Sequence, residues 1–164
     1  MKIRLRTSYE RELADLIEIV RRESLDEFIN NIRYTRTRPY SRISAICMER
    51  KITLAEVCMR GPRDSETGIL YRYIKQICGE RIVTIYRGGK TRSASEIKPG
   101  DWVALDEKEA RWYGRFVSKL NVTPYDVVWA GTYEKEWFYI PRHLQGLFKD
   151  VREFWEASRN LLSH

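Results

Sequence analysis

The stretch that decides the fold is DVVWAGTYEKEWFYIPR, residues 126–142. A β-branched apolar run ends in a turn that contains Gly131, and a strongly aromatic run follows it. Two such runs around a glycine turn predict a pair of neighbouring strands. Glu134 and Glu136 stand at the start of the second run. Alternate residues of a strand face the same side, so we expect the two side chains to lie roughly 7 Å apart at their roots.

Two carboxylates at this distance repel each other unless water or a cation compensates them. One interpretation is an edge strand whose outer face is charged against aggregation. The other is a carboxylate pair directed at a positively charged transition state. Cleavage of a glycosidic bond is one such case, because the sugar develops oxocarbenium character. The segment itself leaves both interpretations open.

The rest of the chain predicts an α+β fold. Further strands are expected at 81–89, 100–105 and 116–122, and a short helix at 106–114 between Asp106 as N-cap and Gly114 as stop. The first eighty residues show helical periodicity, with Leu13, Leu16, Ile17 and Val20 as one apolar stripe. We therefore expect a single domain, 1–164, with three parts. They are a helical part at 1–80, a mostly antiparallel β core at 81–142 and a C-terminal helix at 143–164.

The composition and charge of the chain limit the kinds of partner and the compartment that we expect. The 164 residues carry a net charge of +7, which favours polyanionic partners or reflects a heat-adapted, thermophile-like surface. The sequence lacks an apolar run long enough to span a membrane, and charges interrupt its first residues. Its three cysteines lack a CxxC spacing, which predicts reduced thiols and a cytoplasmic protein, with one disulfide still open in a hyperthermophile. We expect no membrane partner and no metal site.

Two further features of the β half suggest a ligand site. YRGG places Arg87 at the end of a strand and Gly88 directly after it. Arg can clamp a phosphate with two hydrogen bonds, and Gly lets a ligand approach the backbone. Most aromatic residues of this half are expected in the core, but Trp102 and Tyr113 are candidates for stacking on a planar ring. Taken singly, a solvated arginine at the strand end and a plain glycine turn are the favoured explanations of the YRGG motif.

The order of these motifs is informative. The succession IVTIYRGG, KPGDWVALDEKEARWYG and DVVWAGTYEKEWFYIPR resembles the ADP-ribosyltransferase fold in its arginine-type arrangement. More narrowly, it resembles the domains of this fold that phages, archaeal viruses and mobile elements carry. The resemblance covers residues 81–142 and implies a viral or mobile-element effector that modifies host machinery in the host cytoplasm. It also implies NAD as the substrate and a protein or nucleic acid as the acceptor.

The resemblance assigns roles to four residues. Arg87 would lie against the phosphates and the nicotinamide ribose of NAD, and the Gly88 backbone would hold the nicotinamide amide. Glu136 would accept a hydrogen bond from the ribose 2′-hydroxyl and stabilise the positive charge that develops as nicotinamide leaves. Glu134 would orient the incoming nucleophile.

One departure from the family pattern concerns the strand that normally carries a set of hydroxyl residues. This sequence reads Val103-Ala104-Leu105-Asp106 there. Asp106 can replace a serine as the helix cap, but a third carboxylate near Glu136 adds electrostatic repulsion. Either NAD binds differently or catalysis is weakened, so binding without turnover stays open.

Two alternatives remain. In the less favoured one, Asp106 and Lys108 form the Asp-x-Lys pattern of a metal-dependent nuclease, with Asp101 as the nearest second carboxylate. The other is a non-catalytic nucleic-acid binder that uses a segment in which arginines and tyrosines alternate. Its residues are Arg33, Tyr34, Arg36, Arg38, Tyr40 and Arg42. A solvated loop between helices explains the same segment.

Overall fold

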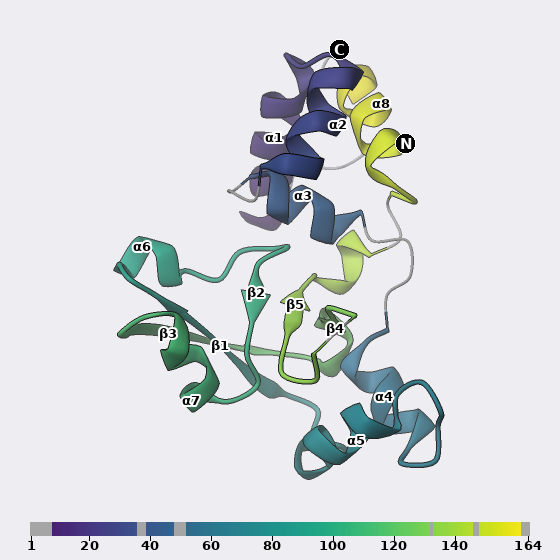
Figure 1. Cartoon of the computed structure of the whole chain (residues 1–164), viewed down its shortest axis with the longest axis vertical. Helices are drawn as coiled ribbons and strands as arrows, with labels where there is room; N and C mark the ends of the chain where they lie inside the picture. The colour runs from purple at the N-terminus through teal and green to yellow at the C-terminus, as the bar shows by residue number, and fades with distance from the viewer. Residues whose placement is uncertain (1–7, 36–38, 48–51, 132, 146–147, 162–164) are drawn as a thin grey trace. The chain divides into compact units, whose positions relative to one another are not determined.

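The structure is a computed structural model that describes residues 8–35, 39–47, 52–131, 133–145 and 148–161. The chain forms two compact units, which Figure 1 shows. A helical unit comprises 1–49, 98–100 and 144–164, and a mixed unit comprises 50–97 and 101–143. The expected α+β class is confirmed, with a helical N-terminal half, small antiparallel sheets and a C-terminal helix. The number of domains stays a prediction.

The helical unit consists of α1 (Ser8–Arg21), α2 (Leu25–Tyr34), α3 (Tyr40–Ile46) and α8 (Val151–Leu161). The apolar stripe predicted for the first helix is buried, and each of its four residues is 3% exposed or less. Phe28 of α2 stacks on Phe154 of α8 with 6.4 Å between the ring centroids. Ser24 accepts a hydrogen bond from the Glu27 amide and so caps the N-terminus of α2.

A polar cluster joins these helices around Glu23. The Tyr40 hydroxyl donates to the Glu23 carboxylate, and the Asn31 amide donates to the same oxygen at 2.9 Å. The main-chain carbonyl of Glu23 accepts from Trp155 Nε1 at 3.0 Å and from Arg159 Nη2 at 2.6 Å. Burial and the neighbouring Glu23 carboxylate raise the pKa of Tyr40 to about 12, so Tyr40 is protonated at neutral pH.

The mixed unit begins with α4 (Leu54–Arg60), α5 (Gly68–Ile74) and the 3-10 turn η1 (Lys75–Ile77). A disulfide between Cys58 and Cys78 ties α4 to the residue after η1. The expectation of reduced thiols is therefore wrong for this pair. It failed because the two residues lie far apart in the sequence, and spacing alone does not show that the fold brings their Cα atoms to 5.5 Å. Cys47 is a buried thiol outside the disulfide.

Two small antiparallel sheets form the β core, which confirms the expected strand direction. β1 (Val83–Gly89) pairs with β3 (Phe116–Val122) along their full length. The second sheet has the order β2 (Trp102–Val103), β5 (Trp137–Tyr139) and β4 (Val127–Trp129). A single bridge between Tyr86 and Ala104 connects the two sheets.

Short helical turns complete the unit and flank the strands. Their bounds are α6 (Arg92–Ser95), α7 (Glu107–Ala110), η2 (Arg111–Tyr113), η3 (Pro124–Asp126) and η4 (Arg142–Leu144). The helix expected at 106–114 is present as α7 and η2. Asp106 caps it by accepting from the Glu109 amide at 2.7 Å, and Gly114 ends it. The short helix α6 was not predicted from the sequence.

The two glutamates do not share a strand face, so that prediction is wrong. β5 begins at Trp137, and Glu134 lies in the turn between β4 and β5. The Glu136 amide donates to the Tyr133 carbonyl, and the Glu136 carbonyl accepts from the Ala130 amide, each at 3.1 Å. These bonds close the turn one residue before β5 begins, so strand alternation does not apply to Glu134.

No helix in the described part of the chain is long and apolar enough to cross a bilayer.

Candidate functional site

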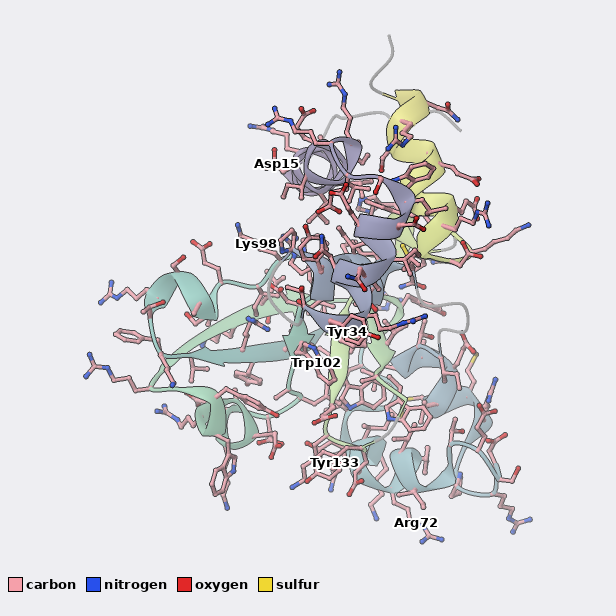
Figure 2. All side chains as sticks on the ribbon, turned by 45° about the horizontal axis from the view of Figure 1, so that its top comes forward. Asp15, Tyr34, Arg72, Lys98, Trp102 and Tyr133 are labelled. Atoms are coloured by element: carbon pink, nitrogen blue, oxygen red, sulfur yellow. A yellow bond between two sulfur atoms is a disulfide. The ribbon has the colours of Figure 1, made fainter. Side chains whose placement is uncertain are left out.

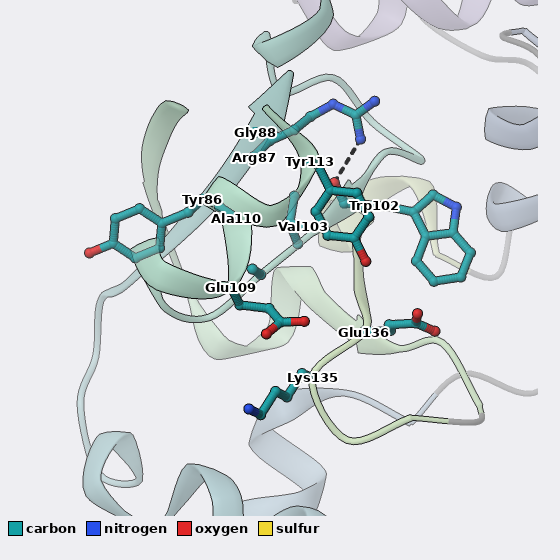
Figure 3. Close-up of a pocket in the computed structure, with 11 residues that line it drawn as sticks. Tyr86, Arg87, Gly88, Trp102, Val103, Glu109, Ala110, Tyr113, Lys135 and Glu136 are labelled. Atoms are coloured by element: carbon teal, nitrogen blue, oxygen red, sulfur yellow. Dashed lines mark hydrogen bonds between the residues drawn. The ribbon is translucent and has the colours of Figure 1, made fainter. Parts of the chain in front are cut away.

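A pocket of about 310 Å³ opens in the mixed unit (Figure 3). Its walls come from β1, β2 with the residue after it, the α7–η2 turn, and the turn before β5. The lining residues are Tyr86, Arg87, Gly88, Trp102, Val103, Ala104, Glu109, Ala110, Tyr113, Lys135 and Glu136. Four segments between residues 86 and 136 therefore converge on one site.

Arg87 is fixed on one wall of this pocket. Its Nη1 donates to the Trp102 carbonyl at 2.8 Å, drawn as the dashed line in Figure 3, and its Nε donates to the Ala94 carbonyl at 3.1 Å. The Asp101 carboxylate is 4.0 Å from Nε and only 2% exposed. The side chain of Arg87 is 20% exposed. The guanidinium is thus held in one orientation, and Arg87 contributes to the lining of the pocket.

Gly88 and Gly89, which follow Arg87, allow the α7–η2 turn to approach β1 closely. A Cβ on Gly88 would lie 1.8 Å from the Ala110 carbonyl oxygen, so a larger residue does not fit there. A Cβ on Gly114 would lie 2.1 Å from the Gly89 carbonyl carbon. The α7–η2 turn therefore packs backbone to backbone against the end of β1. This contact brings Glu109 and Tyr113 to the pocket.

The side of the pocket away from Arg87 carries carboxylates. Figure 3 shows Glu109 and Glu136 there, with Lys135 beside them. Burial raises the pKa of Tyr113, and the charges of Glu136 and then Glu109 raise it further. The Tyr113 phenol is therefore neutral at physiological pH and lies within electrostatic reach of both carboxylates. The pocket thus has Arg87 on one side and two carboxylates, with one lysine beside them, on the other.

Two aromatic rings stand at the edge of the pocket. Trp102 is 43% exposed and Tyr113 is 57% exposed, although both line the cavity. Trp102 is held in place by an edge contact with Phe138, whose ring centroid is 4.5 Å away. Large exposed rings beside a cavity provide flat surfaces for a planar ligand.

The pocket brings together five of the six residues that the sequence suggested for a NAD site. They are Arg87, Gly88, Trp102, Tyr113 and Glu136. Glu134 is not among the lining residues, and its main-chain carbonyl accepts from Trp137 Nε1 at 2.8 Å. Its predicted role in orienting a nucleophile stays a prediction.

Three lining residues with polar side chains were not among the site residues predicted from the sequence: Tyr86, Glu109 and Lys135. Glu109 was interpreted as part of a helix cap, but it lies four residues before Tyr113, and this helical spacing would have placed both on one face. Tyr86 precedes Arg87 in a strand, where neighbours normally face opposite sides. Nothing in the local pattern indicates that both border one cavity.

The segment proposed for nucleic-acid binding lies in the helical unit, and its residues differ in accessibility. Arg33 and Tyr34 are exposed, Tyr34 at 71%, and Figure 2 labels Tyr34. Arg42 is 7% exposed and donates from Nε to the Pro99 carbonyl at 2.9 Å. Tyr40 is half-buried and bonded to Glu23. Arg36 and Arg38 lie outside the described residues.

The carboxylates of the nuclease alternative have protein partners. Asp106 accepts from the Glu109 amide and from the Tyr73 hydroxyl, both at 2.7 Å. Asp101 is buried beside Arg87. In the described ranges, no three His, Cys, Asp or Glu side chains are grouped so that they could hold a metal ion.

Comparison of the chain with protein-family models, with curated proteins and with solved structures finds no match.

Proposed function

We propose that the pocket binds NAD and that the protein transfers ADP-ribose from NAD to a macromolecular acceptor. One observation carries the proposal: Arg87 and Glu136, a cation and an anion from distant parts of the chain, line the same pocket. NAD has the matching features, because its diphosphate is anionic and its reacting ribose becomes cationic as the glycosidic bond breaks. The resemblance in the order of motifs points to the same substrate.

The size of the pocket supports a nucleoside-sized ligand group. A volume of about 310 Å³ lies at the lower end of the range for small-molecule sites. It suits the nicotinamide and its ribose, while the rest of the dinucleotide would extend past Arg87. Trp102 and Tyr113 offer their exposed faces to the nicotinamide ring. Arg87 would then lie against a phosphate of NAD and offset its negative charge.

The chemistry assigned to the pocket is substitution at the ribose C1′ of NAD. The bond from C1′ to the nicotinamide nitrogen breaks, and its electron pair leaves with nicotinamide, which becomes neutral. The sugar passes through an oxocarbenium-like state that Glu136 stabilises by its negative charge. A nucleophilic atom of the acceptor then forms the new bond to C1′ and releases its proton to solvent or to a carboxylate.

Two residues of the pocket are candidates for roles whose expected residues are missing from it: the hydroxyl that orients Glu136 and the carboxylate beside the nucleophile. The pocket-lining strand segment Val103–Ala104 brings no hydroxyl, and Tyr113 is the hydroxyl residue whose pKa responds to Glu136. We therefore assign Tyr113 the role of orienting Glu136. Glu109 is the second carboxylate of the pocket, whereas Glu134 is not in the lining. This makes Glu109 the better candidate for a carboxylate beside the incoming nucleophile.

The decisive experiment compares the wild-type protein with Glu136→Gln. NAD binding is measured by calorimetry, and transfer of labelled ADP-ribose is measured in lysate. Glu136→Gln should keep NAD affinity within a few-fold and lower transfer by about a hundredfold or more, because it removes a charge needed in the transition state. Glu80→Gln, at an exposed carboxylate outside the pocket lining, is the matched control and should leave both unchanged. Equal transfer by wild type and Glu136→Gln, or no NAD affinity at low salt, would refute the proposal.

A further inference from the structure

Tyr73 is not among the residues that line the pocket, yet it is bonded to the helix that forms one of the pocket's walls. It belongs to α5, and its hydroxyl donates to Asp106 Oδ2 at 2.7 Å. The other oxygen of the same carboxylate, Oδ1, accepts from the Glu109 amide at 2.7 Å and so caps α7. One carboxylate therefore joins α5 to the first turn of α7, and the bond from Tyr73 fixes the orientation in which Asp106 caps that turn.

The same tyrosine also contacts the turn before β5. The Lys135 ammonium lies over the Tyr73 ring, with 5.9 Å between Nζ and the ring centroid. Lys135 directly precedes Glu136, and both residues line the pocket. Figure 3 shows Glu109 and Glu136 on the same side of the pocket. Tyr73 thus contacts both segments from which the carboxylates of the pocket come.

The surroundings of the Tyr73 hydroxyl keep it protonated, so that it acts as a donor. Burial raises the pKa of Tyr73, the hydrogen bond to Asp106 raises it further, and the charges of Asp106 and then Glu109 add to the effect. The hydroxyl is therefore neutral across the physiological pH range. It also lies within electrostatic reach of the carboxylate that α7 carries into the pocket.

The helix that carries Tyr73 is firmly held. Leu70 and Ile74 of α5 are buried. The disulfide between Cys58 and Cys78 ties α4 to the residue after η1, which directly follows α5. Because the backbone of α5 is fixed by burial and by this covalent link, the Tyr73 hydroxyl has a fixed position. We therefore expect removal of this hydroxyl to change the position of α7 rather than that of α5.

We propose that Tyr73 is a positioning residue of the transferase. Through Asp106 it holds α7, and with it Glu109, in a fixed place relative to Glu136. The inference rests on the proposed function, in which Glu109 lies beside the incoming nucleophile and Glu136 stabilises the sugar cation. A small displacement of such a group lowers the rate far more than it weakens ground-state binding, because the alignment is needed in the transition state.

The test compares wild type with Tyr73→Phe in steady-state transfer of labelled ADP-ribose from NAD. Tyr73→Phe keeps the ring and removes the hydroxyl, so it should lower kcat about tenfold. KM for NAD should stay within about twofold of wild type, because Arg87 and Trp102, which we assign to NAD binding, come from β1 and β2. The matched control is Tyr71→Phe, which removes a hydroxyl two residues away on α5, where the side chain faces another side of the helix.

The control should leave kcat and KM as in wild type. An unchanged kcat in Tyr73→Phe would overturn the inference, and so would equal losses in the two variants. A loss that appears in KM for NAD instead of kcat would also overturn it, because Tyr73 would then support the binding of NAD and not the alignment of the carboxylates.

A second variant tests whether Tyr73 acts through Asp106. Asp106→Ser keeps a good helix cap but lacks the second oxygen that accepts from Tyr73. It should lower kcat about as much as Tyr73→Phe does. The double variant Tyr73→Phe/Asp106→Ser should lose no more than either single variant, since both break the same contact. Losses that multiply in the double variant would overturn the inference.

Hydrogen exchange measured by mass spectrometry without NAD separates this inference from the proposed function. In Tyr73→Phe, the amides of α7 and η2 should exchange about tenfold faster, since the bond removed involves a charged group. Those of β1 and β3 should exchange as in wild type. If wild type transfers no ADP-ribose, the proposed function fails, and exchange alone decides whether Tyr73 holds α7. Unchanged exchange in α7 of an active protein would refute the positioning role and leave the proposed function standing.

Discussion

Gly88 and Ala110 approach so closely that a Cβ on Gly88 would lie 1.8 Å from the Ala110 carbonyl oxygen. This contact holds α7 and η2 against β1. It therefore determines where Glu109 and Tyr113 stand relative to Arg87 in the pocket. The glycine after Arg87 is required by packing, whatever ligand the pocket takes.

We expect Gly88→Ala to lower the free energy of unfolding by about 3 kcal/mol, because the backbone of α7 has to move to admit one methyl group. Urea unfolding followed by tryptophan fluorescence measures the change. Gly131→Ala is the control, since Gly131 has a φ of 101°, and within the described residues no atom beyond its chain neighbours lies within 4 Å of the added Cβ. It should cost about 1 kcal/mol from backbone strain alone. Equal losses in the two variants would show that the Gly88 contact is not tight.

The second prediction concerns Asp101, which is buried 4.0 Å from Arg87 Nε. Asp101→Asn keeps the shape and removes the charge, so Arg87 loses an anion in a partly buried setting. We expect a loss of about 2 kcal/mol, less than breaking a fully buried pair, because Arg87 keeps its bonds to two carbonyls. A double-mutant cycle with Arg87→Gln measures the coupling by urea unfolding. Strictly additive losses would contradict a direct interaction.

The third prediction concerns the disulfide between Cys58 and Cys78, which closes a loop with a sequence separation of 20. Cys58→Ser/Cys78→Ser should lower the free energy of unfolding by about 3 kcal/mol, because the unfolded chain regains the freedom of that loop. Thiol alkylation in denaturant checks the pairing first. Without reductant we expect one reactive thiol, from Cys47, and after reduction three. Three thiols in the unreduced protein would contradict the disulfide.

The fourth prediction concerns pH and the hydroxyl of Tyr40, whose pKa is raised from 10.0 to about 12. A folded-state pKa above the unfolded value means that the stabilising contribution is complete below pH 10. It is lost as the pH rises from 10 to about 12. Tyr40→Phe should therefore flatten the decline of the unfolding free energy over this interval, measured by urea titration at several pH values. Tyr34→Phe, at a tyrosine that is 71% exposed, should leave the decline as in wild type.

Much of the fold could be predicted because it depends on local patterns. The stripe of Leu13, Leu16, Ile17 and Val20 is buried as its helical spacing indicated. The cap at Asp106 also forms as predicted, since a cap depends on residues within one turn. The disulfide and the converging walls of the pocket depend on contacts between distant segments, which no local pattern contains.

Part of the candidate site could also be predicted, because its motifs and their order are visible in the sequence. The order of motifs suggested Arg87 and Glu136, and the structure places both in one pocket. The prediction of one strand that carries both Glu134 and Glu136 was wrong, because hydrogen bonds at Tyr133 and Ala130 extend the turn up to Trp137. Glu109 was missed because its helix-capping pattern explained it without a further role.

The boundary between the two units has a practical consequence for anyone who cuts this gene into fragments. The sequence pattern changes from helical to strand-like near residue 80, yet the mixed unit begins at residue 50. A fragment that starts at 81 would lack Tyr73, whose hydroxyl donates to the Asp106 cap of α7, and would lose that support beneath Glu109. Expressed fragments should therefore begin upstream of α4. They should also retain residues 98–100, which belong to the helical unit although they lie between two parts of the mixed unit in the sequence.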